Sequence, residues 1–527
     1  MKKLLAILMV IALVAVTFVG VVSAFDQFRD ESESSPSDSP SPSDSPSDSP
    51  SSTVTTDPES SGAPSADLEP FYSQELDWES CQDDAECATL SVPLDYADAA
   101  GETIEVALLK VPARDARQGS LVVNPGGPGA PGTQYAAAAS RVFREPLLRA
   151  FDIVGFDPRG TGESAPVDCL TDDELDDYLA SDPNPDTAAE EQEFADFVEA
   201  FGEGCAQRSG NAVNHVSTIE TARDMDVLRA ALGESTLTYL GASYGTKLGA
   251  TYAELFPDRV GRLVLDGAVD VSLDNRQLGL EQAAGFETAL RSYIENCVDT
   301  TETCFLGDTV DEGLATITDL VTDIESDPLP AADGRELQVG NAFYGIITPL
   351  YNRDYWSYLS AALRSALDGD GTALMQLADI YSSRGPEGYT DNSSEAIFAI
   401  NCLDDPSAAD FEAVEAELPA YEEASPTFGS IFAWSLTSCG GSQGRTTEKP
   451  LEIRAEGAAP ILVVGTTRDP ATPLKWAEAL AEQLESGVLL RRDGDGHTAY
   501  NSGNECIDTA IESYLLEGTV PADPTDC

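Results

Sequence analysis

The chain has 527 residues, enough for two or three domains with a sizeable hydrophobic core. Its 93 acidic and 29 basic residues give a formal net charge of −64, which argues against a nucleic-acid partner because phosphate contacts need clustered Lys and Arg. The acidic excess has two interpretations, which can both hold: a solvated surface suited to salty or acidic surroundings, or a negative potential that attracts cationic substrates such as peptides with free amino termini.

Residues 1–24 are predicted to be an export signal. Lys2 and Lys3 precede an apolar run at 4–22, and small residues at 22–24 form a cleavage site. Because the apolar run is long for a signal, an uncleaved anchor is the alternative, and it is the only membrane contact that the sequence suggests. We therefore expect the protein to be secreted or tethered to the outer cell surface.

Residues 25–70 are predicted to form a disordered linker. Their central part, 31–66, is dominated by Ser, Pro and Asp with SPSDSP repeated, and it has too few apolar side chains to fold. Such a segment is extended and self-repelling, so it would hold a folded domain away from a membrane or wall, or remain as a spacer after cleavage.

The ten cysteines agree with export, because disulfides persist outside the cytosol. Since no C-x-x-C pair or clustered histidine points to a metal, we expect no metal and no other cofactor. An even count alone leaves the connectivity open. The clustering predicts pairs of sequence neighbours: Cys81 with Cys87, Cys169 with Cys205, Cys297 with Cys304, Cys402 with Cys439, and Cys506 with Cys527.

Residues 71–270 alternate between short apolar runs and helical patterns, which indicates the first part of an α/β core. The predicted strands lie at 102–111, 120–123, 151–156, 237–240 and 260–265, and several end in glycine-rich turns. Such alternation predicts a mostly parallel, doubly wound sheet with helices on both faces. The loops that follow the strands would share one edge of the sheet, where ligands bind.

The alternation stops at residues 271–455, which are rich in helical patterns and contain four of the cysteines. We predict that this segment is a helical cap inserted between two core strands. The alternation resumes in residues 456–527, with apolar runs at 460–464 and 488–490. This last segment would complete the core.

The segment at 236–256 carries the pattern of a catalytic nucleophile. An apolar run is followed by GASYG at 241–245 and then by apolar residues at helical spacing. Strand, G-x-S-x-G and helix form the nucleophile elbow of an α/β-hydrolase, in which Ser243 takes a strained conformation and the glycines let strand and helix approach. The turn would expose the Ser243 hydroxyl near the positive end of a helix dipole.

A serine nucleophile needs a base, and this chain offers only two histidines. His497 lies in a glycine-flanked loop after a short strand and completes the order Ser, acid, His that α/β-hydrolases show. His215 precedes Ser243 and lies just before the helix that leads into the strand of Ser243. We therefore predict that His497 is the base and that His215 is an ordinary loop or packing residue.

The acid that orients the base has two candidates. Asp469 ends the strand before the histidine strand, which is the usual position. Asp266 follows the next strand after the elbow, which is an alternative position in this fold, but it could equally serve as a turn former before Gly267. We favour Asp469 and keep Asp266 as the alternative.

The oxyanion of the tetrahedral intermediate needs two preorganised N–H donors. One should be the amide of Tyr244, directly after the nucleophile. The other should come from the glycine-rich turn at 124–129, from Gly127 or Gly126. The alternative for that segment is a plain tight turn with no catalytic function.

Six motifs in the same order resemble those of the actinobacterial tripeptidyl aminopeptidase-like serine peptidases, which are secreted α/β-hydrolases related to proline iminopeptidases. The motifs are NPGGPG, DPRGTG, GASYGT, VLDGAVD, TRDPATP and GHT, and the similarity covers residues 77–527 with the cap as its weakest part. The resemblance implies a triad of Ser243, Asp469 and His497, with Gly127 and Tyr244 as oxyanion donors.

Two details of the resemblance concern specificity. Proline iminopeptidases have a histidine before their Gly-Gly-Pro-Gly turn, whereas this chain has Pro125, which favours the tripeptidyl branch. The sequence NCLD at 401–404 resembles a cap motif of the family. Asp404 in this motif could bind the amino terminus of the substrate, with a surface acid as the alternative.

The sequence therefore predicts an exported serine peptidase that acts through an acyl-enzyme. It would release short peptides, tripeptides in the first place, or single residues from the free amino terminus of peptides, and peptides are the only partner that the sequence implies. An esterase or other acyl hydrolase of the same fold is the first alternative, because both reactions use the same catalytic parts. A non-catalytic surface binding protein is the second, against which the intact triad argues. Nothing in the sequence indicates the oligomeric state.

Overall fold

The computed structural model describes residues 62–82, 84–301 and 303–527. The predicted export signal and most of the predicted linker lie outside the described residues. Within the described part, none of the helices combines the length and the apolar character that crossing a membrane requires.

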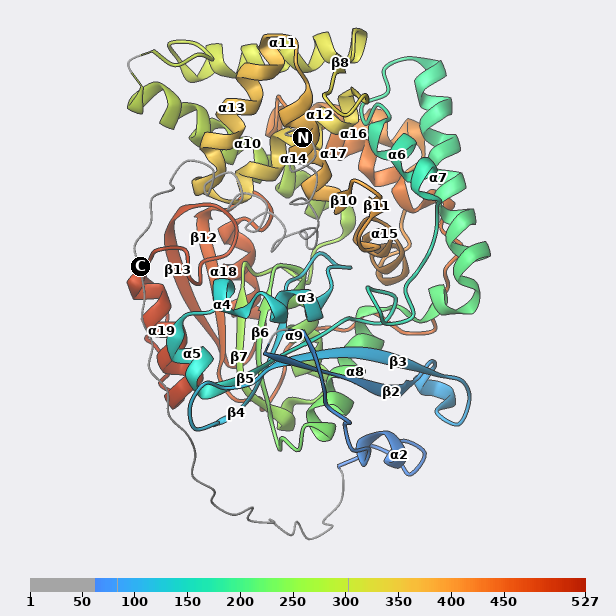
Figure 1. Cartoon of the computed structure of the whole chain (residues 1–527), viewed down its shortest axis with the longest axis vertical. Helices are drawn as coiled ribbons and strands as arrows, with labels where there is room; N and C mark the ends of the chain where they lie inside the picture. Colours follow the sequence, from blue (N-terminus) through green and yellow to red (C-terminus); the bar gives the residue numbers. More distant parts are fainter. Residues whose placement is uncertain (1–61, 83, 302) are drawn as a thin grey trace, which may run out of the picture.

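A ten-stranded sheet crosses the lower half of the molecule in the order β1-β2-β3-β5-β4-β6-β7-β12-β13-β14 (Figure 1). The strands are β1 (Glu79–Gln82), β2 (Ala85–Pro93), β3 (Thr103–Val111), β4 (Gly119–Asn124), β5 (Phe151–Phe156), β6 (Leu237–Ala242), β7 (Val260–Asp266), β12 (Ile461–Arg468), β13 (Gly487–Asp495) and β14 (Thr525–Asp526). Neighbours from β5 to β14 pair in parallel, and the pairs from β1 to β5 are antiparallel. The predicted α/β-hydrolase fold is confirmed.

The strand order places the loops after β4 and β6 side by side. The chain runs from β4 outward to β5 and then returns to β6 on the other side of β4, which makes β4 a switch point of the kind where ligands bind. Asn124 pairs with Gly241, and Asp266 pairs with both Ala242 and Val464. The carboxyl ends of β4, β6, β7 and β12 therefore lie at one level of the sheet.

Alternating side chains of the strands pack into two hydrophobic clusters, one on each face of the sheet. Val122 and Val463 belong to the cluster with helices α8, α9 and α18, whereas Val123 and Val464 belong to the cluster with α5 and α19. The helices of the core are α3 (Gly132–Ala137), α4 (Ala139–Val142), α5 (Glu145–Ala150), α8 (Thr218–Ala231), α9 (Tyr244–Leu255), α18 (Leu474–Gln483) and α19 (Glu505–Glu517). Burial on both faces explains the continuous apolar runs of the central strands.

Helices gather above the carboxyl edge of the sheet, in the upper half of Figure 1. They are α10 (Asn275–Thr300), α11 (Val310–Ser326), α12 (Val339–Ile347), α13 (Trp356–Leu367), α14 (Thr372–Ser382), α15 (Ser393–Asp404), α16 (Phe411–Ala424) and α17 (Gly429–Trp434), with the short pairs β8 (Leu329–Pro330) and β9 (Glu336–Leu337), and β10 (Arg384–Gly385) and β11 (Gly388–Tyr389). α10 to α14 pack around a hydrophobic cluster of their own. α15 is different, because its buried side chains belong to the main core cluster.

Two helices between β5 and β6 join the cap, although they lie in the sequence segment predicted as core. α6 (Asp172–Ala180) packs against α12, where a methyl group on Gly340 would lie 2.5 Å from the carbonyl oxygen of Leu179. α7 (Ala188–Ser209) runs along the right side of the cap in Figure 1. The cap is therefore built from two separate stretches of the chain.

The five predicted disulfides are confirmed. The bonds join Cys81 to Cys87, Cys169 to Cys205, Cys297 to Cys304, Cys402 to Cys439, and Cys506 to Cys527, and none of the ten cysteines is free. The last bond fastens the chain end beside β14 to α19. Each bond closes a loop of fewer than 40 residues, so each constrains the unfolded chain locally.

Packed structure begins before Phe71, inside the segment predicted as linker. Leu68 is buried against the core, and α2 (Glu69–Tyr72) follows it. The hydroxyl of Tyr72 donates to the buried carboxylate of Asp226, 2.6 Å away. Arg259 also pairs with Asp226 and donates to the carbonyl of Gly62. This contact fixes where the chain leaves the core.

Candidate active site

Ser243 joins β6 to α9 in a strained conformation, with φ 56° and ψ −124°. A side chain at Gly241 would meet the carbonyl oxygen of Gly245 at 2.3 Å, so only glycine fits where strand and helix cross. The Ser243 amide donates to the carbonyl of Asp266 (2.9 Å), and the Thr246 hydroxyl donates to the carbonyl of Ser243 (2.6 Å). These bonds hold the strained turn and leave the serine side chain half-buried at the end of the strand.

His497 lies after β13 and faces Asp469, which lies after β12. Nδ1 of the imidazole is 2.9 Å from both carboxylate oxygens of Asp469, and the two side chains are 2% and 0% exposed. The carboxylate also accepts the amides of Ala471 and Thr472 and the hydroxyl of Thr472. Asp469 is thus held in place by its own loop, and it in turn orients the imidazole.

Asp266, the alternative acid, bonds to the backbone next to His497. Its carboxylate accepts the amides of Ala499 and Tyr500, both at 2.9 Å, and its own carbonyl accepts the amide of Ser243. Asp266 therefore connects the nucleophile turn to the histidine loop. Of the two predicted acids, Asp469 is the one whose carboxylate contacts Nδ1 of the imidazole.

Burial raises the pKa of the Asp266 carboxyl to about 6, which predicts a pH-dependent contribution to stability. The native state then binds the proton more tightly than the unfolded chain, whose Asp pKa is about 3.9, so this contribution is full below pH 4 and is lost as the pH rises through 6. Measured by urea unfolding, the free energy of unfolding of wild type minus that of Asp266→Asn should fall by up to about 3 kcal/mol from pH 4 to pH 7. A flat difference curve would contradict the raised pKa.

The glycine-rich turn after β4 lies directly over the nucleophile turn. A methyl group on Gly126 would lie 2.6 Å from the carbonyl oxygen of Ala242 and 2.8 Å from Cβ of Ser243. The Gly126 amide donates to Oδ1 of Asn124 (3.0 Å), so it is already used. Within the part of the chain that the structure describes, the amides of Gly127 and Tyr244 form no hydrogen bond to protein atoms.

His215 lies in a different environment from His497. It ends a short 3-10 helix (Gly210–His215), and its Nδ1 is 3.1 Å from Oε1 of Glu220. Glu220 also lies 3.6 Å from the guanidinium of the buried Arg159. His215 thus contacts a carboxylate in the first turn of α8 that also lies near a buried arginine.

Asp404 ends α15, and its carboxylate is occupied by groups of the protein. It accepts the amide of Thr218 (2.9 Å) and the hydroxyl of Thr218 (2.5 Å), and it forms an ion pair with Lys247 of α9 at 2.7 Å. A substrate ammonium group would have to displace that lysine. The expected role as the partner of the substrate's amino terminus therefore does not fit this environment, and we do not retain it.

The cap contacts the histidine loop directly. The His497 amide donates to the carbonyl of Tyr351 (2.8 Å), and the two rings meet edge to face at 5.5 Å. Arg353 and Ser292, both from the cap, bond to Asp495 at the end of β13. Sequence reasoning missed Tyr351, since a tyrosine in a helical segment carries no distinguishing pattern. Thr472, whose hydroxyl lies 3.2 Å from Nδ1 of His497, could have been noticed within the TRDPATP motif.

A cavity of about 420 Å³ opens in the cap between α6, α12 and α14. Two ion pairs line it, Arg384 with Asp176 and Arg335 with Asp379. Tyr344 also lines it and stacks on Tyr381 at 4.7 Å. Neither Ser243 nor His497 lines this cavity, so it is separate from the candidate site around these two residues.

Comparison with known proteins finds relatives that are named as peptidases and as an esterase. A family model described as TAP-like protein matches residues 425–527. Serine protease Hip1 of Mycobacterium tuberculosis is 36% identical over 484 residues, covering 87% of this chain and 92% of that protein. Carboxylesterase B of the same species is 35% identical, covering 90% and 93%. Tripeptidyl aminopeptidase of Streptomyces lividans is 32% identical, covering 86% of each.

Proposed function

The chain belongs to the family of tripeptidyl aminopeptidase-like serine peptidases of the α/β-hydrolase fold, and from this premise we propose that it releases short peptides from the free amino terminus of its substrates. The proposal assigns Ser243 as nucleophile, His497 as base and Asp469 as the orienting acid. The observation that carries it is the buried His497–Asp469 pair at 2.9 Å, placed at the same edge of the sheet as the strained Ser243. No metal or cofactor takes part in the proposed reaction.

In the proposed mechanism Ser243 Oγ attacks the scissile carbonyl, and Nε2 of His497 accepts the hydroxyl proton. Nδ1 of His497 keeps its own proton throughout, because the N–H group is hydrogen-bonded to the carboxylate of Asp469. The amides of Gly127 and Tyr244 bind the oxyanion of the tetrahedral intermediate. His497 then gives its proton to the leaving amine, which leaves as the shortened peptide. Water hydrolyses the acyl-enzyme with the same base, and the amino-terminal fragment is released as an acid.

We choose Gly127 rather than Gly126 as the second oxyanion donor because the Gly126 amide is already hydrogen-bonded within the protein. Oδ1 of Asn124 accepts the Gly126 amide, whereas the amides of Gly127 and Tyr244 have no protein acceptor among the described residues. Two such unpaired donors beside a nucleophile are what a developing oxyanion needs. The hydrogen bond from the Gly126 amide to Asn124 then holds the turn in the conformation that leaves the Gly127 amide free for the oxyanion.

The substrate class follows from the family and from charge. Tripeptidyl aminopeptidase from Streptomyces is a relative along most of the chain, and the net charge of −64 favours the approach of peptides with a free amino group. The five disulfides support a site of action outside the cytosol. An esterase is the second candidate, because the relative named carboxylesterase B is 35% identical.

The proposal predicts a preference that fluorogenic substrates can measure. A tripeptidyl amide with a free amino terminus should exceed its acetylated twin in kcat/KM by about ten- to hundredfold, because a pocket built for an ammonium group leaves its polar atoms unpaired against a blocked substrate. The assay is run in high salt, which removes the contribution of the acidic surface to the association rate.

The control is a short-chain ester assayed beside both amides, with Ser243→Ala as the inactive reference. If the enzyme cleaved the ester but neither amide, the protein would be an esterase and the proposed peptidase function would be wrong. Equal rates for the free and acetylated tripeptides would mean that the pocket is open at that end, so the enzyme would be an endopeptidase.

A further inference from the structure

Helix α15 belongs to the cap in sequence but packs into the core, where it touches both segments that supply the oxyanion donors. The ring of Phe398 lies 4.3 Å from that of Phe201, centre to centre, and Ala399 and Cys402 belong to the same hydrophobic cluster as Tyr244. Cap helices α10 to α14 enclose a separate cluster, whereas α6 and α7 share the cluster of α15. Unlike α10 to α14, α15 is therefore continuous with the core.

The first turn of α15 lies against the glycine-rich turn after β4. A methyl group on Gly129 would lie 2.8 Å from Cβ of Ala396 and 3.0 Å from the carbonyl oxygen of Ser393. Gly129 has φ +95°, so the turn can approach the helix only with glycine at this position. Any shift of this end of α15 would move the turn that carries the Gly127 amide.

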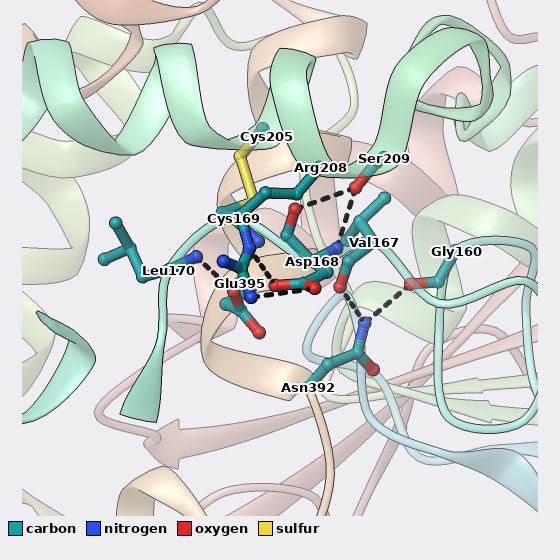
Figure 2. The surroundings of a disulfide bond; sticks show 10 residues. All are labelled: Gly160, Val167, Asp168, Cys169, Leu170, Cys205, Arg208, Ser209, Asn392 and Glu395. Atoms are coloured by element: carbon teal, nitrogen blue, oxygen red, sulfur yellow. Dashed lines mark hydrogen bonds and ion pairs between the residues drawn. A yellow bond between two sulfur atoms is a disulfide. The ribbon is translucent and has the colours of Figure 1, made fainter. Parts of the chain in front are cut away.

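Five hydrogen bonds fasten that end of the helix to the loop after β5, and Figure 2 shows all of them except the bond to Gly162. The side-chain amide of Asn392 donates to the carbonyls of Gly160 and Val167. The side-chain oxygen of Asn392 accepts the amide of Gly162. One carboxylate oxygen of Glu395 accepts the amides of Cys169 (2.6 Å) and Leu170 (2.9 Å). Burial raises the pKa of Glu395, and the two amides oppose that rise.

The other end of α15 reaches the second donor through a chain of hydrogen bonds. An ionised carboxylate only accepts, so the Thr218 hydroxyl gives its hydrogen to Asp404 and its oxygen accepts from the phenol of Tyr244, 2.7 Å away. Tyr244 is buried, so this relay fixes the side chain of the residue whose amide follows Ser243. Asp404 also pairs with Lys247, one turn further along the same helix as Tyr244.

We propose that α15 sets the geometry of the oxyanion hole, with Asp404 and Glu395 as positioning residues at its two ends. The proposal rests on the proposed function, since it presumes that Ser243 is the nucleophile. One rigid helix that touches both donor segments fixes the distance between the two amides, and it makes that distance depend on how the cap is seated. Two disulfides reinforce the same ends: Cys402 lies on α15 itself, and Cys169 is the residue whose amide Glu395 accepts.

The test compares Asp404→Asn and Glu395→Ala with Glu287→Ala, a control matched to the second variant; alanine is used because the oxygen of a glutamine could still accept both amides at position 395. Glu287 is a buried cap carboxylate that accepts the Ser425 hydroxyl and the Thr427 amide but contacts neither donor segment. Each variant is assayed for kcat and KM on the tripeptidyl amide. A peptide aldehyde, whose adduct places an oxyanion in the hole, and an unreactive peptide amide are then used as competing inhibitors.

Loss of one oxyanion donor costs about 10²- to 10³-fold, so a displaced donor should lower kcat by about ten- to hundredfold with KM nearly unchanged. The aldehyde should bind more weakly by the same factor and the unreactive amide should bind as before, while Glu287→Ala keeps the wild-type kcat and aldehyde affinity. Tyr244→Phe removes only the relay hydroxyl and tests the proposal if Asp404→Asn does not fold. If both positioning variants lost thermal stability but kept kcat and aldehyde affinity, α15 would be merely structural. Failure of the proposed function itself would appear differently, as a wild-type enzyme whose Ser243 neither turns over the amide nor reacts with a fluorophosphonate.

Discussion

Replacing His497 by alanine is expected to lower kcat by about 10⁴- to 10⁶-fold, with KM changed only a few-fold. The imidazole is the only group in the proposed mechanism that removes the hydroxyl proton of Ser243 and returns it to the leaving amine. Its Nδ1 is held 2.9 Å from Asp469, which leaves Nε2 as the basic nitrogen. Steady-state rates on a tripeptidyl amide, with active-site concentration determined for each preparation, measure the loss.

His215→Ala is the matched control, because it removes the other histidine of the chain. His215 contacts Glu220 of α8, so its replacement should leave kcat nearly unchanged, although losing this contact can lower thermal stability slightly. Ser243→Ala should lose about as much activity as His497→Ala, and the double variant no more than either, because the two groups act as a unit. Equal losses in His215→Ala and His497→Ala would contradict the assignment of the base.

The fold was largely predictable because its information is local. The central strands of the core are continuous apolar runs, and several of them end at glycines that a close approach of the backbone requires, as at Gly126 and Gly241. The order of the motifs in the chain also predicts which strand ends meet, since parallel strands place their following loops at one edge. The Ser243 turn and the His497–Asp469 pair lie at that edge, at the ends of β6, β12 and β13.

The environment of Asp404 could not be predicted in the same way. Its carboxylate forms an ion pair with Lys247, which is 157 positions away in the sequence, and accepts hydrogen bonds from Thr218, which is 186 away. No pattern within either segment indicates the pairing, because it is set by where α15 is placed on the core. An acidic residue in a cap motif therefore suggested a substrate contact, while its actual partners come from the core.

The composition of the cap shows a related limit. α6 and α7 have ordinary helical patterns and follow a core strand, so the sequence analysis included them in the predicted core segment at 71–270. What places them in the cap is packing against α12 and against the chain near Gly441, where a methyl group on Gly202 would lie 1.9 Å from the Gly441 carbonyl oxygen. Helical periodicity shows that a face is buried, but it does not identify the partner that covers it.

Replacing the proposed orienting acid, Asp469, gives the second large expected effect. Asp469→Asn is expected to lower kcat by about 10⁴-fold, because an amide at this position would offer its N–H to Nδ1 of His497 and favour the tautomer whose Nε2 already carries a proton. The oxygen of the asparagine can still accept the Ala471 and Thr472 amides, which both bond to the same oxygen of Asp469, so the loop should keep its shape. Melting temperatures measured beside the kinetics check that the fold is retained.

Asp266→Asn is the comparison for this prediction. Asp469 contacts the imidazole of His497 itself, whereas Asp266 bonds to the backbone of the loop that carries His497. Asp266 bonds the amides of Ala499 and Tyr500, so weakening these bonds should shift the loop and cost about tenfold in kcat, the effect of roughly one hydrogen bond. Burial raises the pKa of the wild-type Asp266 carboxyl to about 6, so the pH profile of kcat should differ between wild type and Asp266→Asn near pH 6. Asp469→Asn, in contrast, should be slow at every pH. The reverse ranking at equal thermal stability would assign the acid to Asp266, and the His497 ring would then have to turn away from Asp469 in the working enzyme.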